Sequence, residues 1–391
     1  MKVFLIYRHF YLPESGTLHL GGIENYMAAL GELFISQGYQ VVVLQPAKQP
    51  FVASYQGIEV RGICCRGYHG NRKKIPLFQA ASREFNRSSD WLIFATDSYF
   101  VASDLPRTVA IQHGISWDKP GKGTGVVAMV RAWLQQRKYL AFVRHCCNLV
   151  CVDHNFVNWY RTQRDITPCQ RWSVIPNFCL ESACKNQIEQ KWSAIGPVKL
   201  LIARRFVDYR GIPLACAVVK LLLARYPQLM VSFAGEGPLE SMLQQEFGAD
   251  PRVRIFSYRP QDSLEIHLQH QLVLLPSVGS EGTSLSLAEA MAAGCAVVST
   301  NVGGLTNMVL NQHNGLICMP EATVLASKLG QLIEQPEYAK QLALMAHQTA
   351  SQSFSKARWQ QDWLALFAEI EANELSASQP IQQVRLPAGA L

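Results

Sequence analysis

Several features that would assign a class at once are missing from this sequence of 391 residues. No stretch of 18 consecutive apolar residues occurs, which argues against a membrane-spanning helix. The apolar core of the opening MKVFLIYRHF is too short for a signal peptide, and no small-residue cleavage site follows it. The eleven cysteines lack the paired spacing of a zinc site, and they cluster only at Cys146, Cys147 and Cys151. We therefore expect a cytoplasmic protein with reduced thiols.

Composition and charge indicate a folded protein with an uneven surface. Hydrophobic residues make up 49% of the chain and charged residues 17%, which is typical of globular α/β proteins. Because this length exceeds what one core usually supports, we expect two domains. Residues 1–178 contain 20 Lys and Arg against 11 Asp and Glu, whereas residues 179–391 contain 16 against 18. The basic part indicates an anionic partner, such as a membrane surface or a phosphorylated molecule, or else simply a basic solvated surface.

Short apolar runs alternate with helical patterns along the whole chain, which is typical of βαβ units and parallel sheets. The runs that we interpret as strands lie at 2–7, 41–46, 91–96, 107–112, 149–153, 171–177, 198–203, 229–235, 253–258, 272–277 and 296–300. We predict an α/β fold with two doubly wound domains that face each other across a cleft.

The domain boundaries follow from composition. We expect a first domain over 1–184, a polar linker over 185–197 that ends at Gly-Pro, and a second domain over 198–355. A C-terminal helix over 356–375 is expected to cross back to the first domain. The Pro- and Gln-rich segment 376–391 is expected to be a disordered tail.

The stretch SEGTSLSLAEAMAAGCAVVST, residues 280–300, follows a predicted strand and begins a helix. Backbone amides of residues 282–285 and the positive end of the helix dipole would favour a phosphate there. Glu281 and Glu289 flank this position, and a carboxylate binds a vicinal diol well. A phosphate between two diols describes a nucleotide-sugar. The alternative is that Glu281 only begins the helix and Glu289 is solvated.

This stretch and five others resemble the motifs of family-4 retaining glycosyltransferases, which have the GT-B fold of two Rossmann-like domains. EGTSLSLAEAMAAGCAVVSTNVGG is similar to the Glu-x7-Glu signature of that family. The other matching pieces, in the family's order along residues 1–320, are HLGGIENYMAALGELFISQGYQVVVL, IQHGISWD, VIPNF, IARRFVDYRGI and FAGEGPLESML. The resemblance implies sugar transfer from a nucleotide-sugar with retention at the anomeric carbon.

The resemblance also implies roles for individual residues. Arg205 and Arg210 would bind the donor diphosphate, and two cations can stabilise a departing diphosphate in place of a metal ion. The sequence has no Asp-x-Asp pair, so we predict chemistry without a metal ion or other cofactor. Gly21 and Gly22 would let the backbone approach the donor closely. His113 would lie near the transferred sugar, contacting it through its carbonyl or ring.

Further donor contacts are implied around the same cleft. Tyr258 would lie near the base, Gly235 belongs to the Gly-x-Gly-Pro-Leu element, and Thr283, Ser284 and Leu285 would meet the phosphates. Glu281 would bind the transferred sugar and Glu289 the ribose. The donor could be UDP-, GDP- or ADP-linked.

The sequence departs from the family pattern at three positions. Arg204 stands where the family has Gly, Arg210 replaces a Lys, and Asn307 replaces a frequent carboxylate. We interpret the first two as peripheral or charge-preserving changes. The change at Asn307 puts one contact in doubt.

The acceptor is expected to be a glycan or a lipid-linked molecule, in lipopolysaccharide or other envelope polysaccharide synthesis, and not a nucleic acid. Segment 126–147 places Arg131, Lys138 and His145 at seven-residue spacing. Together with the basic run 72–74, it could hold the protein against an anionic membrane at the inner face of the cytoplasmic membrane. The alternative is an amphipathic helix packed on its sheet with a solvated basic face.

Three other functions compete with this interpretation. Gly235 and Gly237 after a strand suggest a dinucleotide-dependent oxidoreductase, but the third glycine position is Glu240. A sugar-nucleotide epimerase of the same architecture would bind the same donor and would need a general base near the sugar. A non-catalytic binding subunit is the third possibility.

Overall fold

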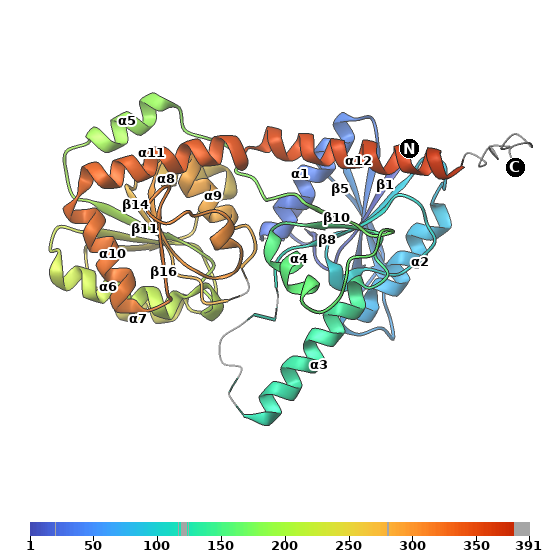
Figure 1. Ribbon diagram of the computed structural model, residues 1–391, viewed down its shortest axis with the longest axis horizontal. Coiled ribbons are helices and arrows are strands. Elements are labelled where there is room, and N and C mark those ends of the chain that lie inside the picture. Colours follow the sequence, from blue (N-terminus) through green and yellow to red (C-terminus); the bar gives the residue numbers. More distant parts are fainter. Residues whose placement is uncertain (20, 116, 119–122, 124, 280, 379–391) are drawn as a thin grey trace, which may run out of the picture.

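Two parallel sheets, each covered by helices on both faces, form the molecule (Figure 1). The computed structural model describes all residues except 20, 116, 119–122, 124, 280 and 379–391. The first sheet belongs to the first part of the chain and the second sheet to the remainder. The predicted α/β class with two doubly wound sheets is confirmed.

The first sheet has the strand order β10-β9-β8-β7-β1-β4-β6-β5. All of its neighbours pair in parallel except β5, which runs antiparallel to β6 at the edge. The chain winds outward from the central β1 in both directions, so the strand ends near β1 form a crevice. The strands are β1 (Lys2–Ile6), β4 (Gln40–Ala47), β5 (Phe51–Tyr55), β6 (Ile58–Cys64), β7 (Trp91–Phe94), β8 (Thr108–Gln112), β9 (Asn148–Cys151) and β10 (Arg171–Val174).

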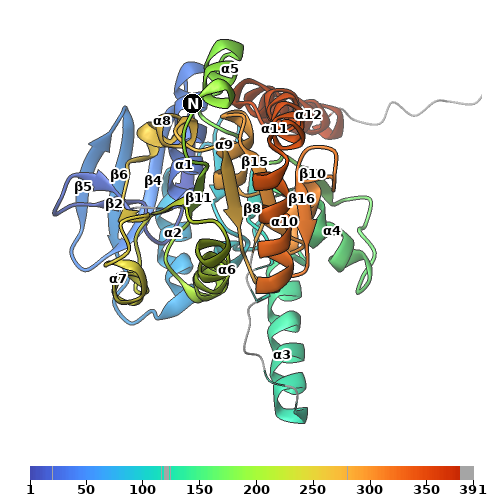
Figure 2. The same cartoon turned by 90° about the vertical axis from the view of Figure 1, so that its left-hand side faces the viewer.

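Helices and a small hairpin complete the first domain. The hairpin of β2 (Tyr11–Leu12) and β3 (Thr17–Leu18) lies between β1 and the first helix. Three helices pack against the sheet, and another, α3, extends far beyond it (Figures 1 and 2). The helices are α1 (Gly22–Ser36), α2 (Lys74–Glu84), α3 (Val126–Val143) and α4 (His154–Arg161).

The second sheet is parallel throughout, with the order β13-β12-β11-β14-β15-β16. Its strands are almost entirely apolar because both faces are covered. The strands are β11 (Lys199–Ala203), β12 (Met230–Ala234), β13 (Val253–Phe256), β14 (Leu272–Leu275), β15 (Ala296–Thr300) and β16 (Leu316–Cys318). The helices are α6 (Ile212–Arg225), α7 (Glu240–Phe247), α8 (Ser263–Leu268), α9 (Leu285–Ala292) and α10 (Ala322–Glu334).

The segment that the sequence assigned to a polar linker forms a helix, α5 (Lys185–Ser193), which packs on the second domain. Lys191 is buried, and its Nζ donates to the carbonyl of Ala293 at 2.8 Å. The Trp192 indole donates to the carbonyl of Gly294 at 3.0 Å. The polar composition hid this helix because its buried contacts come from one apolar side and from a lysine that is satisfied by carbonyl oxygens.

Two helices end the chain. α11 (Pro336–Ser353) lies on the second domain, and α12 (Lys356–Ser378) runs across the first (Figure 1). The indole of Trp363 donates to the Tyr26 hydroxyl at 2.9 Å, and the rings of Phe367 and Phe34 stack with centroids 4.6 Å apart. The expected tail begins later than position 376, because residues 376–378 are still helical; the rest of it lies outside the described residues.

No helix in the part of the chain that the structure describes is both long and apolar enough to cross a membrane.

Candidate functional site

The site is built where two neighbouring strands of the second sheet end. β11 and β14 pair side by side, and each is followed at its carboxyl end by polar residues. Arg204 directly follows β11, whereas Ser277 and Glu281 lie in the loop between β14 and α9. The topology therefore brings these three side chains together at the edge of the sheet where ligands bind in open α/β folds.

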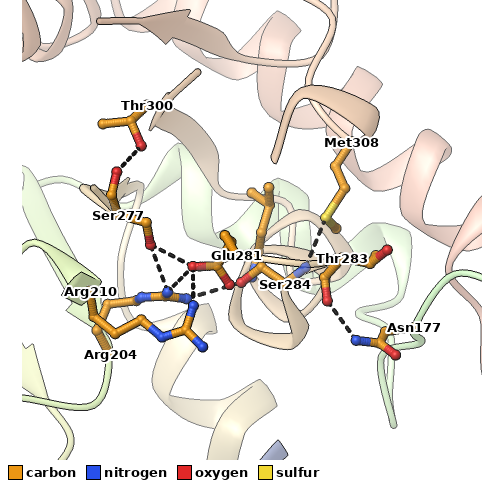
Figure 3. Close-up of polar contacts among 10 residues, drawn as sticks. Asn177, Arg204, Arg210, Ser277, Glu281, Thr283, Ser284, Thr300 and Met308 are labelled. Carbon is orange, nitrogen blue, oxygen red and sulfur yellow. Dashed lines mark hydrogen bonds and ion pairs between the residues drawn. The ribbon is translucent and has the colours of Figure 1, made fainter. Parts of the chain in front are cut away.

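A buried cluster of charges occupies this edge (Figure 3). Glu281 Oε2 accepts hydrogen bonds from the guanidinium groups of Arg204 and Arg210 and from the Ser277 hydroxyl, which is 2.5 Å away. The side chains of Arg204 and Glu281 are each 4% exposed, whereas that of Arg210 is 26% exposed. Burial alone would raise the pKa of Glu281, but the two guanidinium groups outweigh burial and lower it. Glu281 is therefore an ionised carboxylate.

Arg204 holds this cluster together. Its Nη1 donates to the Ser284 hydroxyl at 3.0 Å and its Nη2 to the Ser277 hydroxyl at 2.8 Å, in addition to the ion pair with Glu281. The interpretation of Arg204 as a peripheral replacement for a glycine is therefore wrong. The guanidinium fills the space beside the carboxylate and links β11 to the start of α9.

A glycine pair of the first domain faces this cluster from the other side. A Cβ placed on Gly22 would lie 3.1 Å from Cδ1 of Leu285, and one on Gly21 would lie 3.2 Å from Nη2 of Arg205. Gly21 would also collide with the Glu24 carboxylate. The structure thus brings Gly21, Gly22, Arg205 and Leu285 together across the domain boundary. Space, rather than an unusual backbone angle, requires a residue without a side chain here.

His113 and Gly114 lie at the same boundary. Gly114 has φ +99°, and a Cβ there would lie 2.9 Å from the backbone nitrogen of Gly282. The His113 ring instead points into the first domain, where its Nε2 donates to the Ala95 carbonyl at 3.0 Å and its edge meets the Tyr26 ring. Burial lowers the pKa of His113 to about 4, so the ring is neutral. Its carbonyl, which lies near Gly282, is therefore better placed than the ring to meet a ligand.

Direct hydrogen bonds join the two domains around the loop. The Thr283 hydroxyl donates to the Val152 carbonyl, and the Asn177 side-chain amide donates to the Thr283 carbonyl at 2.6 Å. Asn307 accepts from the backbone of His154 at 2.9 Å, so the position that departs from the family pattern makes an interdomain contact. The hydroxyl that the sequence suggested for a phosphate contact already has a protein partner in this arrangement.

Residues 185–348 match the family model described as glycosyl transferases group 1. A human phosphatidylinositol N-acetylglucosaminyltransferase is 22% identical over 336 residues, or 81% of this chain and 66% of that protein. The structure of sucrose-phosphate synthase from Thermosynechococcus elongatus superposes with a TM-score of 0.76 at 16% identity, over 95% of this chain and 99% of its own. Anabaena HepE in complex with UDP-glucose gives 0.68 at 18% identity, over 96% and 100%.

This chain has the GT-B fold. The predicted architecture and the resemblance to GT-B glycosyltransferases are confirmed. The chain covers 43% of the length of the Schizosaccharomyces pombe relative and 66% of the human one, so it spans only part of these curated relatives.

In the second GT-B domain, Glu289 and Tyr258 form a separate polar group. Glu289 lies on α9 and is partly buried, and burial raises its pKa to about 7 although a hydrogen bond from Ser263 lowers it. Burial also raises the pKa of Tyr258, with a further contribution from the negative charge of Glu289. Ser263 therefore lies between the two side chains, and the acid at Glu289 is half protonated near neutral pH.

Gly235 has a structural reason to be a glycine in this GT-B domain. Its φ is +152°, and a Cβ would collide with the carbonyl oxygen of Arg204. The backbone nitrogen of Gly235 donates to the Phe256 carbonyl at 2.8 Å. The close passage of these two loops keeps Arg204 directed towards Glu281.

Sequence reasoning missed Arg204, Ser277 and Asn177 as members of the site. For the first two a usable signal existed, because each polar residue follows an apolar strand run. For Asn177 no local signal exists, since its partner Thr283 is 106 residues away. Within the described residues, no group of three or more His, Cys, Asp or Glu side chains could hold a metal ion.

Proposed function

We propose that this protein is a family-4 retaining glycosyltransferase that moves a sugar from a nucleotide-sugar to an acceptor hydroxyl without a metal ion. The observation that carries the proposal is the cluster of Arg204, Arg210 and Glu281, which faces Gly21 and Gly22 across the domain boundary. The match to the group 1 glycosyltransferase model covers the part of the chain that contains this cluster.

Charge explains how the cluster would serve a departing diphosphate. Glu281 and Arg204 neutralise each other in the interior, so Arg210, with 26% of its side chain exposed, supplies the excess positive charge at the surface. Arg205 adds a second cation beside the glycine pair. Preorganised cations in a site shielded from water stabilise negative charge as it develops in the transition state. Arg204 is then a positioning residue, and Arg205 and Arg210 are catalytic residues.

The remaining acids would recognise hydroxyl groups. The three hydrogen bonds to Glu281 converge on Oε2, and we assign its Oε1 to a hydroxyl of the transferred sugar. We assign Glu289 to the ribose and Tyr258 to the neighbourhood of the base. Ser284 and Leu285 begin α9, whose positive dipole end suits the phosphates.

The chemical step would need no covalent enzyme intermediate. The bond between the anomeric carbon and the phosphate oxygen breaks, and the acceptor oxygen bonds to the same face of that carbon. The acceptor proton passes to the phosphate oxygen that leaves. Catalysis then rests on positioning and on stabilisation of charge, which is what buried guanidinium groups and tight glycine contacts provide.

The donor and acceptor classes are proposed from relatives. HepE was solved with UDP-glucose, and the human relative is an N-acetylglucosaminyltransferase that is named for phosphatidylinositol. UDP-linked sugars are therefore the first donors to test, ahead of GDP- and ADP-linked ones. We propose a glycan or lipid-linked acceptor of lipopolysaccharide or another envelope polysaccharide, used on the cytoplasmic side of the membrane.

The deciding experiment combines binding with turnover. A thermal-shift panel of nucleotide-sugars, with and without EDTA, should show a donor that stabilises the protein equally in both conditions. Stabilisation that disappears with EDTA would contradict the metal-free scheme. Incubation of that donor alone should give slow hydrolysis at most; formation of an epimer would instead identify an epimerase. Transfer to a lipid or glycan acceptor, with the anomeric configuration read by NMR, completes the test, and binding without any turnover would indicate a non-catalytic role.

A further inference from the structure

Helix α3 projects from the first domain into solvent (Figures 1 and 2). Leu140 and Val143 near its end are buried, and the ring of Tyr139 packs on Trp117 with centroids 4.3 Å apart. By contrast, every side chain from 126 to 138 is exposed or only partly buried. At 1.5 Å per residue, this free part is about 20 Å long. A helix anchored at one end and bare over most of its length needs an explanation, because water alone does not favour it.

The free part of α3 carries large apolar side chains that contact little else. Their exposed fractions range from 50% to 75%, at Val126, Val127, Met129, Val130, Trp133 and Leu134. At 100° per residue these six positions occupy one continuous arc of the helix surface. An exposed apolar face of this kind marks a binding surface rather than a solvated one.

Positive charge borders the same face. Arg131 and Lys138 flank the apolar arc on one side, and the Arg137 guanidinium lies 4.7 Å from the centroid of the Trp133 ring. The sequence from 126 to 143 contains no Asp or Glu. Apolar residues with a tryptophan on one face and flanking cations are the composition of helices that lie in the interface of an anionic bilayer.

We propose that α3 docks the protein on an anionic lipid surface by burying this apolar face among the headgroups and acyl chains. A second copy of the chain is a poorer partner, since pairing two such helices would bring Arg131, Arg137 and Lys138 against their own copies. The excess of Lys and Arg over Asp and Glu in residues 1–178 favours the same anionic surface.

The structure also refines which basic residues face the lipid. Lys74, part of the run 72–74, donates to the Phe100 carbonyl at 2.5 Å and lies 5.1 Å from the centroid of the Phe142 ring at the base of α3. Lys74 therefore supports the base of the helix. The lipid contact belongs to the outer part of α3, where the apolar and basic side chains occur together.

The test is vesicle co-sedimentation of the full chain with phosphatidylglycerol–phosphatidylcholine vesicles and with phosphatidylcholine alone. We expect binding to the anionic vesicles, at least tenfold weaker binding to neutral ones, and a further loss in 0.5 M salt. The variant Val127→Ser/Val130→Ser/Leu134→Ser should lose at least tenfold in affinity for anionic vesicles. The variant Arg131→Gln/Arg137→Gln/Lys138→Gln should lose the preference for anionic lipid.

Matched controls lie elsewhere on the molecule. Val52→Ser alters an apolar side chain that is 72% exposed on edge strand β5, and Lys185→Gln/Lys220→Gln/Arg254→Gln removes three exposed cations from the other domain. Both controls should bind vesicles as the unchanged protein does, and all variants should keep its thermal unfolding temperature. Failure of the unchanged protein to bind anionic vesicles, or equal binding by the apolar triple variant, would overturn the proposal. So would light scattering that shows a dimer lost specifically in that triple variant, because the face would then join two copies.

Discussion

Arg204 and Arg210 contact the same carboxylate oxygen but differ in burial, and this difference separates stability from catalysis. Arg204→Gln should lower the free energy of unfolding by about 3 kcal/mol, because Glu281 stays buried without its main partner. Arg210→Gln leaves that pair in place, so stability should change by less than about 1 kcal/mol while the transfer rate falls roughly a hundredfold. Urea unfolding and initial rates measure the two effects. The exposed Arg254→Gln should change neither, and a rate for Arg210→Gln equal to that of the unchanged protein would remove Arg210 from the mechanism.

Glu289 ties donor binding to pH, because burial raises its pKa to about 7. Its ionised form binds a ribose diol better, so affinity for the nucleotide should rise between pH 6 and pH 8. Stability should change in the opposite direction. A raised pKa in the folded state stabilises the protein fully below the unfolded value and loses that contribution, about 2–3 kcal/mol, as pH rises through 7.

Glu289→Gln provides the comparison for both measurements. Calorimetric titration with nucleotide and urea unfolding, each from pH 5.5 to 8.5, should show a flatter dependence in this variant. Asp97 also has a pKa raised to about 7 by burial, so only the difference between the two proteins reports on Glu289. Identical pH profiles would show that this carboxyl does not titrate there.

At the scale of elements, the loop after β8 must pass very close to the loop before α9. Gly114→Ala would bring a methyl group to 2.9 Å from the Gly282 nitrogen and would force a non-glycine residue to φ +99°. We expect kcat/KM to fall at least tenfold, because the displaced loop carries Glu281. Gly67→Ala is a matched control, since Gly67 also has positive φ, +81°, but open space around it. It should cost only about 1 kcal/mol of stability and no activity. Equal kinetics of the two variants would show that the close approach is unimportant.

Much of the element order could be predicted from local pattern. Runs such as KVFLIY and LVLLPS are buried strands on both faces of a sheet, and their spacing leaves room for one helix each. The residues gathered around Glu281 were also accessible, because a motif records local geometry at the end of a strand. Helix α5 and the role of Arg204 were not, since both depend on partners far along the chain: Lys191 on Ala293, and Arg204 on Glu281.

At the scale of the whole molecule, α12 joins the two domains. Trp363 is fully buried against Tyr26, although it follows the second domain in the chain. Trp363→Ala should cost about 3–5 kcal/mol and should separate the unfolding of the two domains, which we otherwise expect to be one transition. Circular dichroism and tryptophan fluorescence during urea unfolding should then report different midpoints. The half-exposed Trp133→Ala should leave a single transition. Coincident midpoints in Trp363→Ala would show that other contacts couple the domains.

The return of α12 to the first domain also bears on how the protein is made. While a ribosome is still translating the middle of the message, the nascent first domain has its sheet but not the aromatic side chains of α12 that cover Tyr26, Phe34 and Trp91. Its greasy flank would stay open until the polypeptide is nearly finished. A truncation that removes α12 would therefore harm the domain farthest from it in sequence, and chaperones that bind unfinished chains would find their target near the first hundred residues.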